Sequence, residues 1–153
     1  VDRKGFLHIR GRKKDSFKNS TGQFVSPSRI EDKLRVHPAI NQVIIYGLGR
    51  PFNIALIVPD FDYLQSWANQ HDIHWTAPEY MIHNPDIIHY FESLIDQTNK
   101  HLAQHERIGK LTLLHDDWTT ENGMLTSTLK IKRDVIADAF KKLLAAIYRD
   151  AEG

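Results

Sequence analysis

Two apolar runs near the middle of the chain constrain its fold more than any other feature. The runs INQVIIYG (residues 40–47) and NIALIVP (residues 53–59) are rich in valine and isoleucine. β-Branched side chains favour strands, because they fit the half-buried surface of a pleated sheet. The segment GLGRPF that joins the runs contains two glycines and a proline, which are typical of a turn. The pattern therefore predicts a β-hairpin with a sheet built around it.

Strand and helix signals are mixed along the rest of the chain. Further short strands are predicted at residues 5–11, 23–25 and 109–115. Periodic apolar patterns predict helices at about residues 27–36, 63–71, 85–105 and 132–149. Because the clearest strand pair is a hairpin, the expected fold class is α+β, with a small, mostly antiparallel or mixed sheet and packed helices.

Capping residues mark the predicted helix starts. Ser26 and Asn84 each precede a proline, which fits an N-cap followed by the first helical residue. Either Asp60 or Asp62 is suited to cap the helix that follows the second strand of the hairpin. The predicted buried faces of the two long helices comprise Ile88, Phe91, Ile95, Asn99 and Leu102 on the first, and Val135, Ile136, Ala139, Phe140, Leu143, Leu144 and Ile147 on the second.

The composition indicates one folded domain. Of the 153 residues, 41% are hydrophobic and 25% are charged, which is close to globular averages. The net charge of +1 argues against a whole-chain attraction to nucleic acid or membrane, so anion binding must come from local clusters. The lack of cysteine excludes disulfides and thiolate metal sites. No apolar run reaches the roughly 18–20 residues that span a bilayer. Since the chain opens in patterned sequence without an initiating Met, we expect it to be a piece of a longer protein.

Most familiar catalytic patterns are missing. His101 and His105 are four residues apart on a predicted helix, which makes half of a metal site, but no HExxH pattern accompanies them. We therefore expect solvated helix histidines and no bound metal. The GLGRPF turn does not match the GxGxxG pattern of dinucleotide-binding loops, and it joins two strands rather than a strand and a helix. No self-contained catalytic site is predicted.

Two basic clusters remain to be explained. RGRKKDSFK (residues 10–18) carries five basic residues within nine, and KIKR (residues 130–133) carries three within four. Such runs are most often solvated surfaces, and sometimes contact nucleic acid. Both clusters lie in or beside turns between ordered elements, where functional residues tend to be found. Before the second cluster, Asn122-Gly123 predicts a turn, and we expect the serine and threonine run at residues 126–128 to shape the loop that leads to Lys130. A stand-alone module that binds an anionic partner through these loops is therefore one open hypothesis.

Taken together, three segments resemble one family. The stretch GFLHIRGRKKDSFKNSTGQFVSPSRIEDKL resembles the start of the C-terminal domain of adenylate-forming acyl-CoA synthetases. The stretches GRPFNIALIVPDFDYLQSWA and LTSTLKIKR are similar to the long-chain fatty acid branch of that family. The resemblance extends over nearly the whole chain, which it identifies as a single C-terminal lid domain over residues 1–153.

The resemblance implies a two-step reaction. In the parent enzyme, a fatty acid and ATP, with Mg²⁺, give an acyl-adenylate and pyrophosphate. Coenzyme A then takes the acyl group and AMP leaves. The N-terminal adenylation domain, which binds ATP and the acid, is the implied partner and is absent from this chain. The small C-terminal domain is a mobile lid with a different orientation for each step, and it is expected to be inactive alone.

The resemblance also assigns roles to four residues. Lys130 matches the lysine that enters the active site during adenylation, where an ammonium stabilises the charge that develops in the transition state. Arg12 matches the arginine that contacts the nucleotide, and Lys14 matches the hinge about which the lid rotates. Gly22 matches the turn glycine beside the path of coenzyme A, where a missing Cβ allows close approach.

The chain departs from the family pattern at three positions. Ser127 replaces a common proline, Leu129 replaces a common glycine, and Phe24 replaces an arginine found in some relatives, so no coenzyme A contact is assigned to Phe24. The acceptor thiol is left open, because a carrier protein is an alternative to coenzyme A. The expected location is the cytoplasm, and peripheral association with a membrane is left open.

Overall fold

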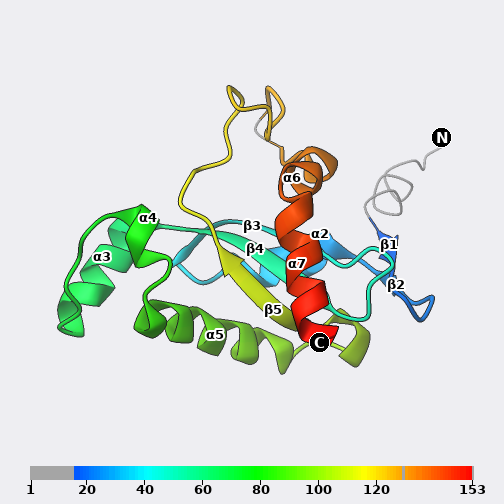
Figure 1. Ribbon diagram of the computed structural model, residues 1–153, viewed down its shortest axis with the longest axis horizontal. Helices are drawn as coiled ribbons and strands as arrows, with labels where there is room; N and C mark the ends of the chain where they lie inside the picture. The colour runs from blue at the N-terminus through cyan, green and yellow to red at the C-terminus, as the bar shows by residue number, and fades with distance from the viewer. Residues whose placement is uncertain (1–15, 129, 153) are drawn as a thin grey trace. The chain divides into compact units, whose positions relative to one another are not determined.

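The computed structural model describes residues 16–128 and 130–152 (Figure 1). The strand predicted at residues 5–11 lies outside this part of the chain. The chain divides into two compact units, one that ends at His115 and one that begins at Asp116.

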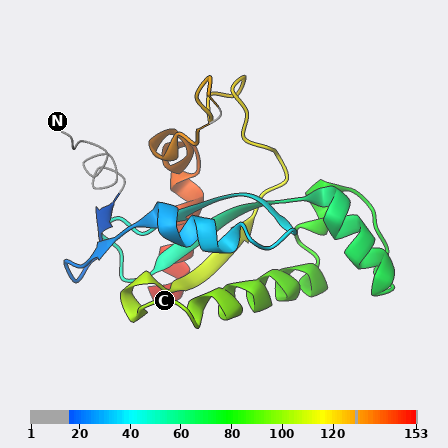
Figure 2. The same ribbon diagram turned by 180° about the vertical axis from the view of Figure 1, so that it is seen from behind.

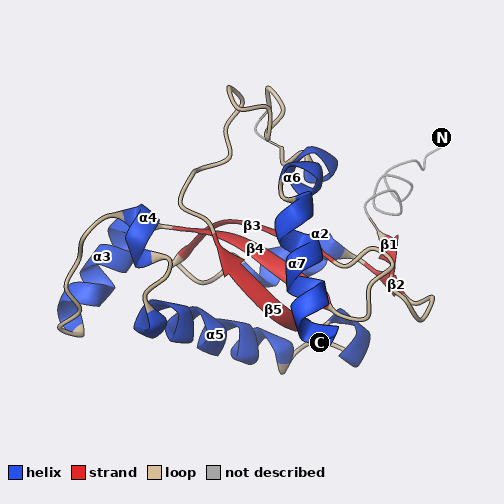
Figure 3. Ribbon diagram, viewed as in Figure 1, coloured by secondary structure: helices blue, strands red, loops and turns tan. Residues whose placement is uncertain are grey.

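A three-stranded mixed sheet forms the centre of the first unit (Figure 3). Strand β3 (Ile40–Tyr46) pairs antiparallel with β4 (Asn53–Pro59), which confirms the predicted hairpin. Strand β5 (Ile108–Leu113) lies on the other side of β4 and runs parallel to it. The fold is therefore α+β with a mixed sheet, as the sequence predicts.

A small separate hairpin precedes the sheet. Strands β1 (Phe17–Lys18) and β2 (Phe24–Val25) pair antiparallel, which confirms the predicted strand near residue 24. The Gly49 amide donates to the Lys18 carbonyl at 2.8 Å, so this hairpin is tied to the turn between β3 and β4.

The first unit includes helices α2 (Pro27–Leu34), α3 (Phe61–Gln70) and the short α4 (Pro78–Met81). Asp60 is the N-cap of α3, and its carboxylate accepts a hydrogen bond from the Tyr63 amide at 3.1 Å. Ser26 occupies the predicted N-cap position of α2, but its side chain makes no capping hydrogen bond.

Helix α5 (Pro85–Asn99) begins as predicted and ends earlier than predicted. The Asn84 side chain accepts from the Asp86 amide at 2.8 Å, which confirms the cap. The expected extension to His105 is wrong, because the Asn99 amide side chain bonds instead to the backbone of Ile108. His101 lies in a turn and His105 in the 3-10 helix η1 (Gln104–Glu106), so the two histidines do not share a helix face.

Helices α2 and α5 cover the same face of the sheet (Figure 2). The α5 stripe is shifted from the predicted one, because Ile88 and Asn99 are only partly buried. The fully or largely buried residues of α5 are Ile87, Phe91, Leu94, Ile95 and Thr98. They pack against the inward-facing side chains of the strands, including Val43, Ile45, Ala55 and Ile57. Burial of each such aliphatic side chain contributes about 1.5–3 kcal/mol, which makes this layer the main source of stability in the unit.

In the described part of the second unit, two helices stand where one was predicted. Helix α6 (Arg133–Ala139) ends at Phe140, whose φ of −106° and ψ of 19° leave the α-helical region, and α7 (Lys141–Glu152) follows at once. The predicted wide apolar face is therefore wrong in part. Ile136 and Leu144 are buried, but Val135 is 43% exposed and Leu143 is 38% exposed.

Candidate functional site

Residues 117–128 and 130–132, before α6, form no helix or strand, and we name this segment the lysine loop. Leu125 and Ile131 pair across its base in an antiparallel bridge. Within the bridge, the Thr126 amide donates to the Lys130 carbonyl at 2.8 Å. The Lys130 amide in turn donates to the Thr126 hydroxyl at 3.0 Å. Thr126 therefore binds both the carbonyl and the amide of Lys130, while the lysine side chain remains exposed.

Asn122 organises the first half of the lysine loop. Its side-chain oxygen accepts from the amides of Thr119 and Met124, at 3.0 and 3.1 Å. Its side-chain nitrogen donates to the Asp117 carbonyl at 2.9 Å. Asparagine often stabilises turns through such bonds to neighbouring backbone groups. The predicted Asn122-Gly123 turn is confirmed, and Gly123 supplies the φ of +80° that the turn needs.

Two further hydrogen bonds lie within the lysine loop. The Lys132 amide donates to the Met124 carbonyl at 2.9 Å, just before the helix begins. The hydroxyls of Thr126 and Thr128 lie 3.0 Å apart. Small polar side chains therefore define the path of the loop, in which Lys130 and Lys132 are both exposed. An ammonium that is held beside a reactant stabilises negative charge on it, as oxyanion-type donors do.

Gly22, the second predicted site residue among those described, belongs to the first unit. It lies in the exposed turn between β1 and β2, and its φ is +83°. The turn is closed by the Asn19 side chain, which accepts from the amides of Thr21 and Gln23, each at 3.0 Å. An added Cβ at Gly22 would meet no described atom within 4 Å, so positive φ is the structural reason for glycine here.

The remaining predicted positions differ in what the structure describes. Arg12, Lys14 and Leu129 lie outside the described residues. Ser127 is exposed in the lysine loop. Phe24 is 65% exposed, and the Lys18 ammonium lies 5.2 Å from the centre of its ring.

The sequence had suggested only that the serine and threonine run shapes the loop. The double contact of Thr126 with Lys130 was missed, because a four-residue spacing between threonine and lysine does not by itself indicate a bridge.

Among residues 16–128 and 130–152, no group of three or more histidine, aspartate or glutamate side chains is placed to hold a metal ion. In the same part of the chain, no helix combines the length and apolar character needed to cross a membrane.

Comparison with known sequences decides the family. The family described as "AMP-binding enzyme C-terminal domain" matches residues 14–152. The chain belongs to this family. Both the β1–β2 turn with Gly22 and the loop that presents Lys130 fall within the matched C-terminal domain.

Curated relatives of this C-terminal domain include fatty acid–CoA ligases. Long-chain-fatty-acid–CoA ligase FadD15 of Mycobacterium tuberculosis is 36% identical over 149 residues, which cover 97% of this chain and 25% of the relative. Long-chain-fatty-acid–CoA ligase 6 of Homo sapiens is 29% identical over 147 residues, covering 94% of this chain and 21% of the relative. The chain therefore spans about a quarter or less of the length of these relatives.

Solved structures share the fold of the domain. The adenylation domain of a carboxylate reductase from Mycobacterium chelonae matches with a TM-score of 0.73 and 23% identity, over 90% of this chain and 20% of that one. A Mycobacterium tuberculosis fatty acyl CoA synthetase matches with a TM-score of 0.53 and 16% identity, over 85% of this chain and 20% of that one.

Proposed function

We propose that this chain is the mobile C-terminal lid of a long-chain fatty acid–CoA ligase, and that Lys130 acts in the adenylation step. The parent enzyme would convert a fatty acid, ATP and coenzyme A into acyl-CoA, AMP and pyrophosphate. The names of the curated relatives support this class of substrate. The observation that carries the role of Lys130 is the loop geometry, in which Thr126 holds the lysine backbone while the ammonium is exposed.

The chemistry of adenylation accounts for a lysine at this position. The fatty acid carboxylate attacks the α-phosphorus of ATP, and the bond from that phosphorus to the pyrophosphate oxygen breaks. Negative charge grows on the phosphoryl oxygens and the leaving pyrophosphate. The Lys130 ammonium would stabilise that charge more in the transition state than in the bound substrates, which is the condition for raising the rate. A held backbone reduces the conformational freedom that the lysine must lose when the lid closes.

The other sequence-derived roles are part of the same proposal. Arg12 would contact the nucleotide, and Lys14 would serve as the hinge between the two lid orientations. Gly22 would lie beside the path of coenzyme A in the thioester-forming orientation, where its exposed turn has no Cβ to obstruct the thiol arm.

The lid needs a partner to complete the active site. We assign ATP, its Mg²⁺ and the fatty acid to an N-terminal adenylation domain of the parent protein. The proposed location is the cytoplasm, where ATP and coenzyme A are both available, and peripheral association with a membrane remains an alternative to be measured.

A carrier protein is the second candidate acceptor. The A-PCP didomain of a carboxylic acid reductase from Segniliparus rugosus matches this fold with a TM-score of 0.72 and 22% identity, which is closer in shape than the fatty acyl CoA synthetase. Offering the parent enzyme either coenzyme A or a phosphopantetheinylated carrier protein distinguishes the acceptors, because only the true acceptor will be acylated at a useful rate.

The test of the lysine uses the full-length parent enzyme and pyrophosphate release. Lys130→Ala should lower the rate of release by on the order of 10²–10³, the size expected when a transition-state charge contact is lost. Lys132→Ala is the matched control, because Lys132 is also exposed and lies two residues further on. An equal loss in both variants would contradict the assignment.

The stand-alone binding module is tested separately with the 153-residue chain. Salt-sensitive retardation of a DNA or RNA probe would support that hypothesis, because neutralised phosphates release counterions. Our proposal expects no retardation at physiological salt.

A further inference from the structure

The two edges of the central sheet are treated differently. On the β3 edge, the buried Glu31 of α2 accepts a hydrogen bond from the Ile45 amide at 2.8 Å. On the β5 edge, the Asn99 side chain bonds to both the amide and the carbonyl of Ile108, each at 2.9 Å. Asn99 therefore imitates a neighbouring strand, but only at the first residue of β5.

Among residues 16–128 and 130–152, no strand lies beside the rest of the β5 edge. The Leu114 amide donates to the Ile57 carbonyl of β4 at 2.8 Å, which fixes the direction of the alternating backbone groups. Since successive residues of a strand point their amides and carbonyls to opposite sides, those of Leu111 and Leu113 point away from β4. Among the strands of the described residues, none pairs with that outer side.

The start of β5 contains an extra residue. The register moves from Asn53 opposite Ile108 to Ile54 opposite Lys110, so Gly109 is a bulge. A Cβ on Gly109 would lie 2.8 Å from the Phe52 ring, which explains why glycine is needed. Bulges often mark the edge of a sheet and redirect the chain beside it.

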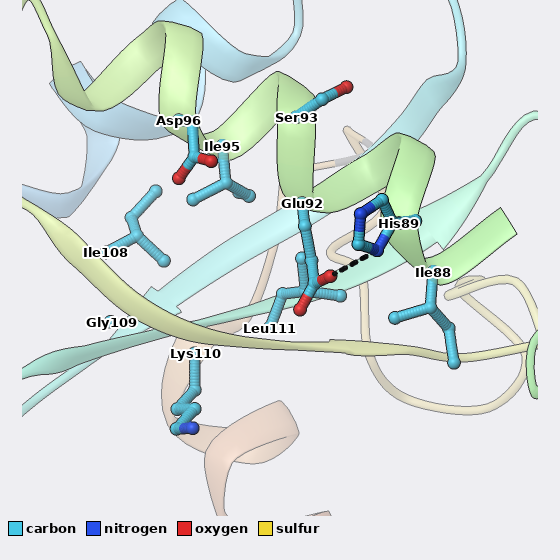
Figure 4. A pocket seen from close by; sticks show the side chains of 10 residues that line it. All are labelled: Ile88, His89, Glu92, Ser93, Ile95, Asp96, Ile108, Gly109, Lys110 and Leu111. Atoms are coloured by element: carbon cyan, nitrogen blue, oxygen red, sulfur yellow. Dashed lines mark ion pairs between the residues drawn. The ribbon is translucent and has the colours of Figure 1, made fainter. Parts of the chain in front are cut away.

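A groove of about 400 Å³ lies between α5 and this edge (Figure 4). Its volume is within the range of ligand-binding clefts. Its walls are Ile88, His89, Glu92 and Asp96 of α5, with Gly109 and Leu111 of β5 opposite them. The groove belongs entirely to the first unit, and it shares no residue with the lysine loop or with the Gly22 turn.

The charges on the groove favour a basic occupant. Glu92 and Asp96 are exposed on the wall formed by α5, and the Glu92 carboxylate lies 3.4 Å from the His89 ring nitrogen. Lys110 also contributes to the groove, but its side chain extends away from α5 (Figure 4). A second copy of this chain, paired through β5, would bring the same carboxylates towards their own equivalents. That repulsion disfavours a homodimer at this edge.

We propose that the β5 edge binds an extended peptide segment of another protein, which adds as a strand and carries lysine or arginine at alternate positions. Backbone hydrogen bonds to Leu111 and Leu113 provide the binding, as in other cases of strand addition. The carboxylates of Glu92 and Asp96 select the basic side chains. This interaction is independent of the proposed ligase function, because none of its residues has a role in the reaction.

The probe is a capped, fluorescently labelled octapeptide that alternates lysine and valine, added to the 153-residue chain. Binding is measured by fluorescence anisotropy and by hydrogen exchange at individual amides. We expect saturable binding at millimolar or lower peptide concentration, with slower exchange at the Leu111 and Leu113 amides. The same peptide N-methylated at alternate residues keeps its charge but cannot complete the strand pairing, so its binding should be lost.

Substitutions in the protein test the charge selection. The double variant Glu92→Lys and Asp96→Lys should weaken binding by roughly tenfold, since two exposed charge contacts are reversed. Asp62→Lys is the control, because it changes an exposed carboxylate on α3 outside the groove. Three results would overturn the proposal: no binding of the lysine peptide, equal binding of the N-methylated peptide, or protection of the two leucine amides by dimerisation alone.

Discussion

The central sheet and the lysine loop are held in place by different forces. In the sheet, side chains such as Ile45, Ala55 and Ile57 are fully buried, and apolar burial provides the stability. In the lysine loop, Asn122 and Thr126 fix the backbone through hydrogen bonds from partly or fully exposed side chains. Each such bond contributes only about 0.5–1.5 kcal/mol of net stability.

This difference separates stability from function. Substitutions in the sheet should lower the free energy of unfolding of the domain and leave the chemistry of each folded molecule unchanged. Substitutions in the loop should slow the reaction, because they change the position of Lys130. They should leave the free energy of unfolding nearly unchanged, because they bury or expose little apolar surface.

Ile57→Ala should produce the largest loss of stability. Ile57 lies on the central strand and is fully buried, so truncation removes apolar contacts and leaves a cavity. We expect a loss of about 2–5 kcal/mol in the free energy of unfolding, measured by urea denaturation of the 153-residue chain. A loss below about 0.5 kcal/mol would show that the sheet is not the main source of stability.

Glu31→Ala should have a smaller effect on the same unit. The variant leaves the Ile45 amide without its carboxylate acceptor at the β3 edge. An unsatisfied buried amide costs about 1–3 kcal/mol, again measured by urea denaturation. Asp32→Ala is the neighbouring control and should change stability by less than about 1 kcal/mol, because the Asp32 side chain is 69% exposed. Equal losses in the two variants would contradict the role of Glu31.

Thr126→Val should affect the reaction rather than stability. Valine has nearly the shape of threonine but cannot accept the hydrogen bond from the Lys130 amide. Loss of about 1 kcal/mol of positioning would slow pyrophosphate release by the full-length parent about fivefold. The midpoint of urea unfolding should be nearly unchanged. A large loss of stability with a normal rate of pyrophosphate release would contradict this, because it would show that the loop stabilises the domain and does not position Lys130.

The smallest predicted effect concerns alkaline pH. Burial, together with a hydrogen bond to Tyr63, raises the pKa of Tyr90 from 10.0 to about 12. The unfolded chain therefore loses the tyrosine proton first, and this contribution to stability is present below pH 10 and declines as the pH rises towards 12. Between pH 10 and pH 12, the free energy of unfolding should fall less for Tyr90→Phe than for the unsubstituted 153-residue chain. The free energy of unfolding of both proteins is measured by urea denaturation across this pH range. An equal decline in the two would exclude the effect.

The sequence was most informative where the signals are local. The β3–β4 hairpin, the Asp60 and Asn84 caps and the Asn122-Gly123 turn each depend on residues close together in the chain, and the structure confirms them. In each case, the local residues supply the strand propensity or the side-chain hydrogen bonds that determine the structure.

The sequence failed where distant residues decide. The end of α5 depends on the bonds between Asn99 and Ile108, which compete with a further helical turn. The break at Phe140 was also missed, because the apolar pattern continues through it. The contact between Thr126 and Lys130 lies inside the antiparallel β-bridge between Leu125 and Ile131. Such a bridge was not predicted, because short loops have no periodic apolar pattern.

The most direct test of the central claim separates the two half-reactions of the parent enzyme. Lys130→Ala is assayed first for acyl-adenylate formation from fatty acid and ATP, and then for acyl-CoA formation from supplied acyl-adenylate. We predict that the first rate falls on the order of 10²–10³ while the second remains within about twofold of the parent rate. An equal fall in both half-reactions would contradict the proposed role of Lys130.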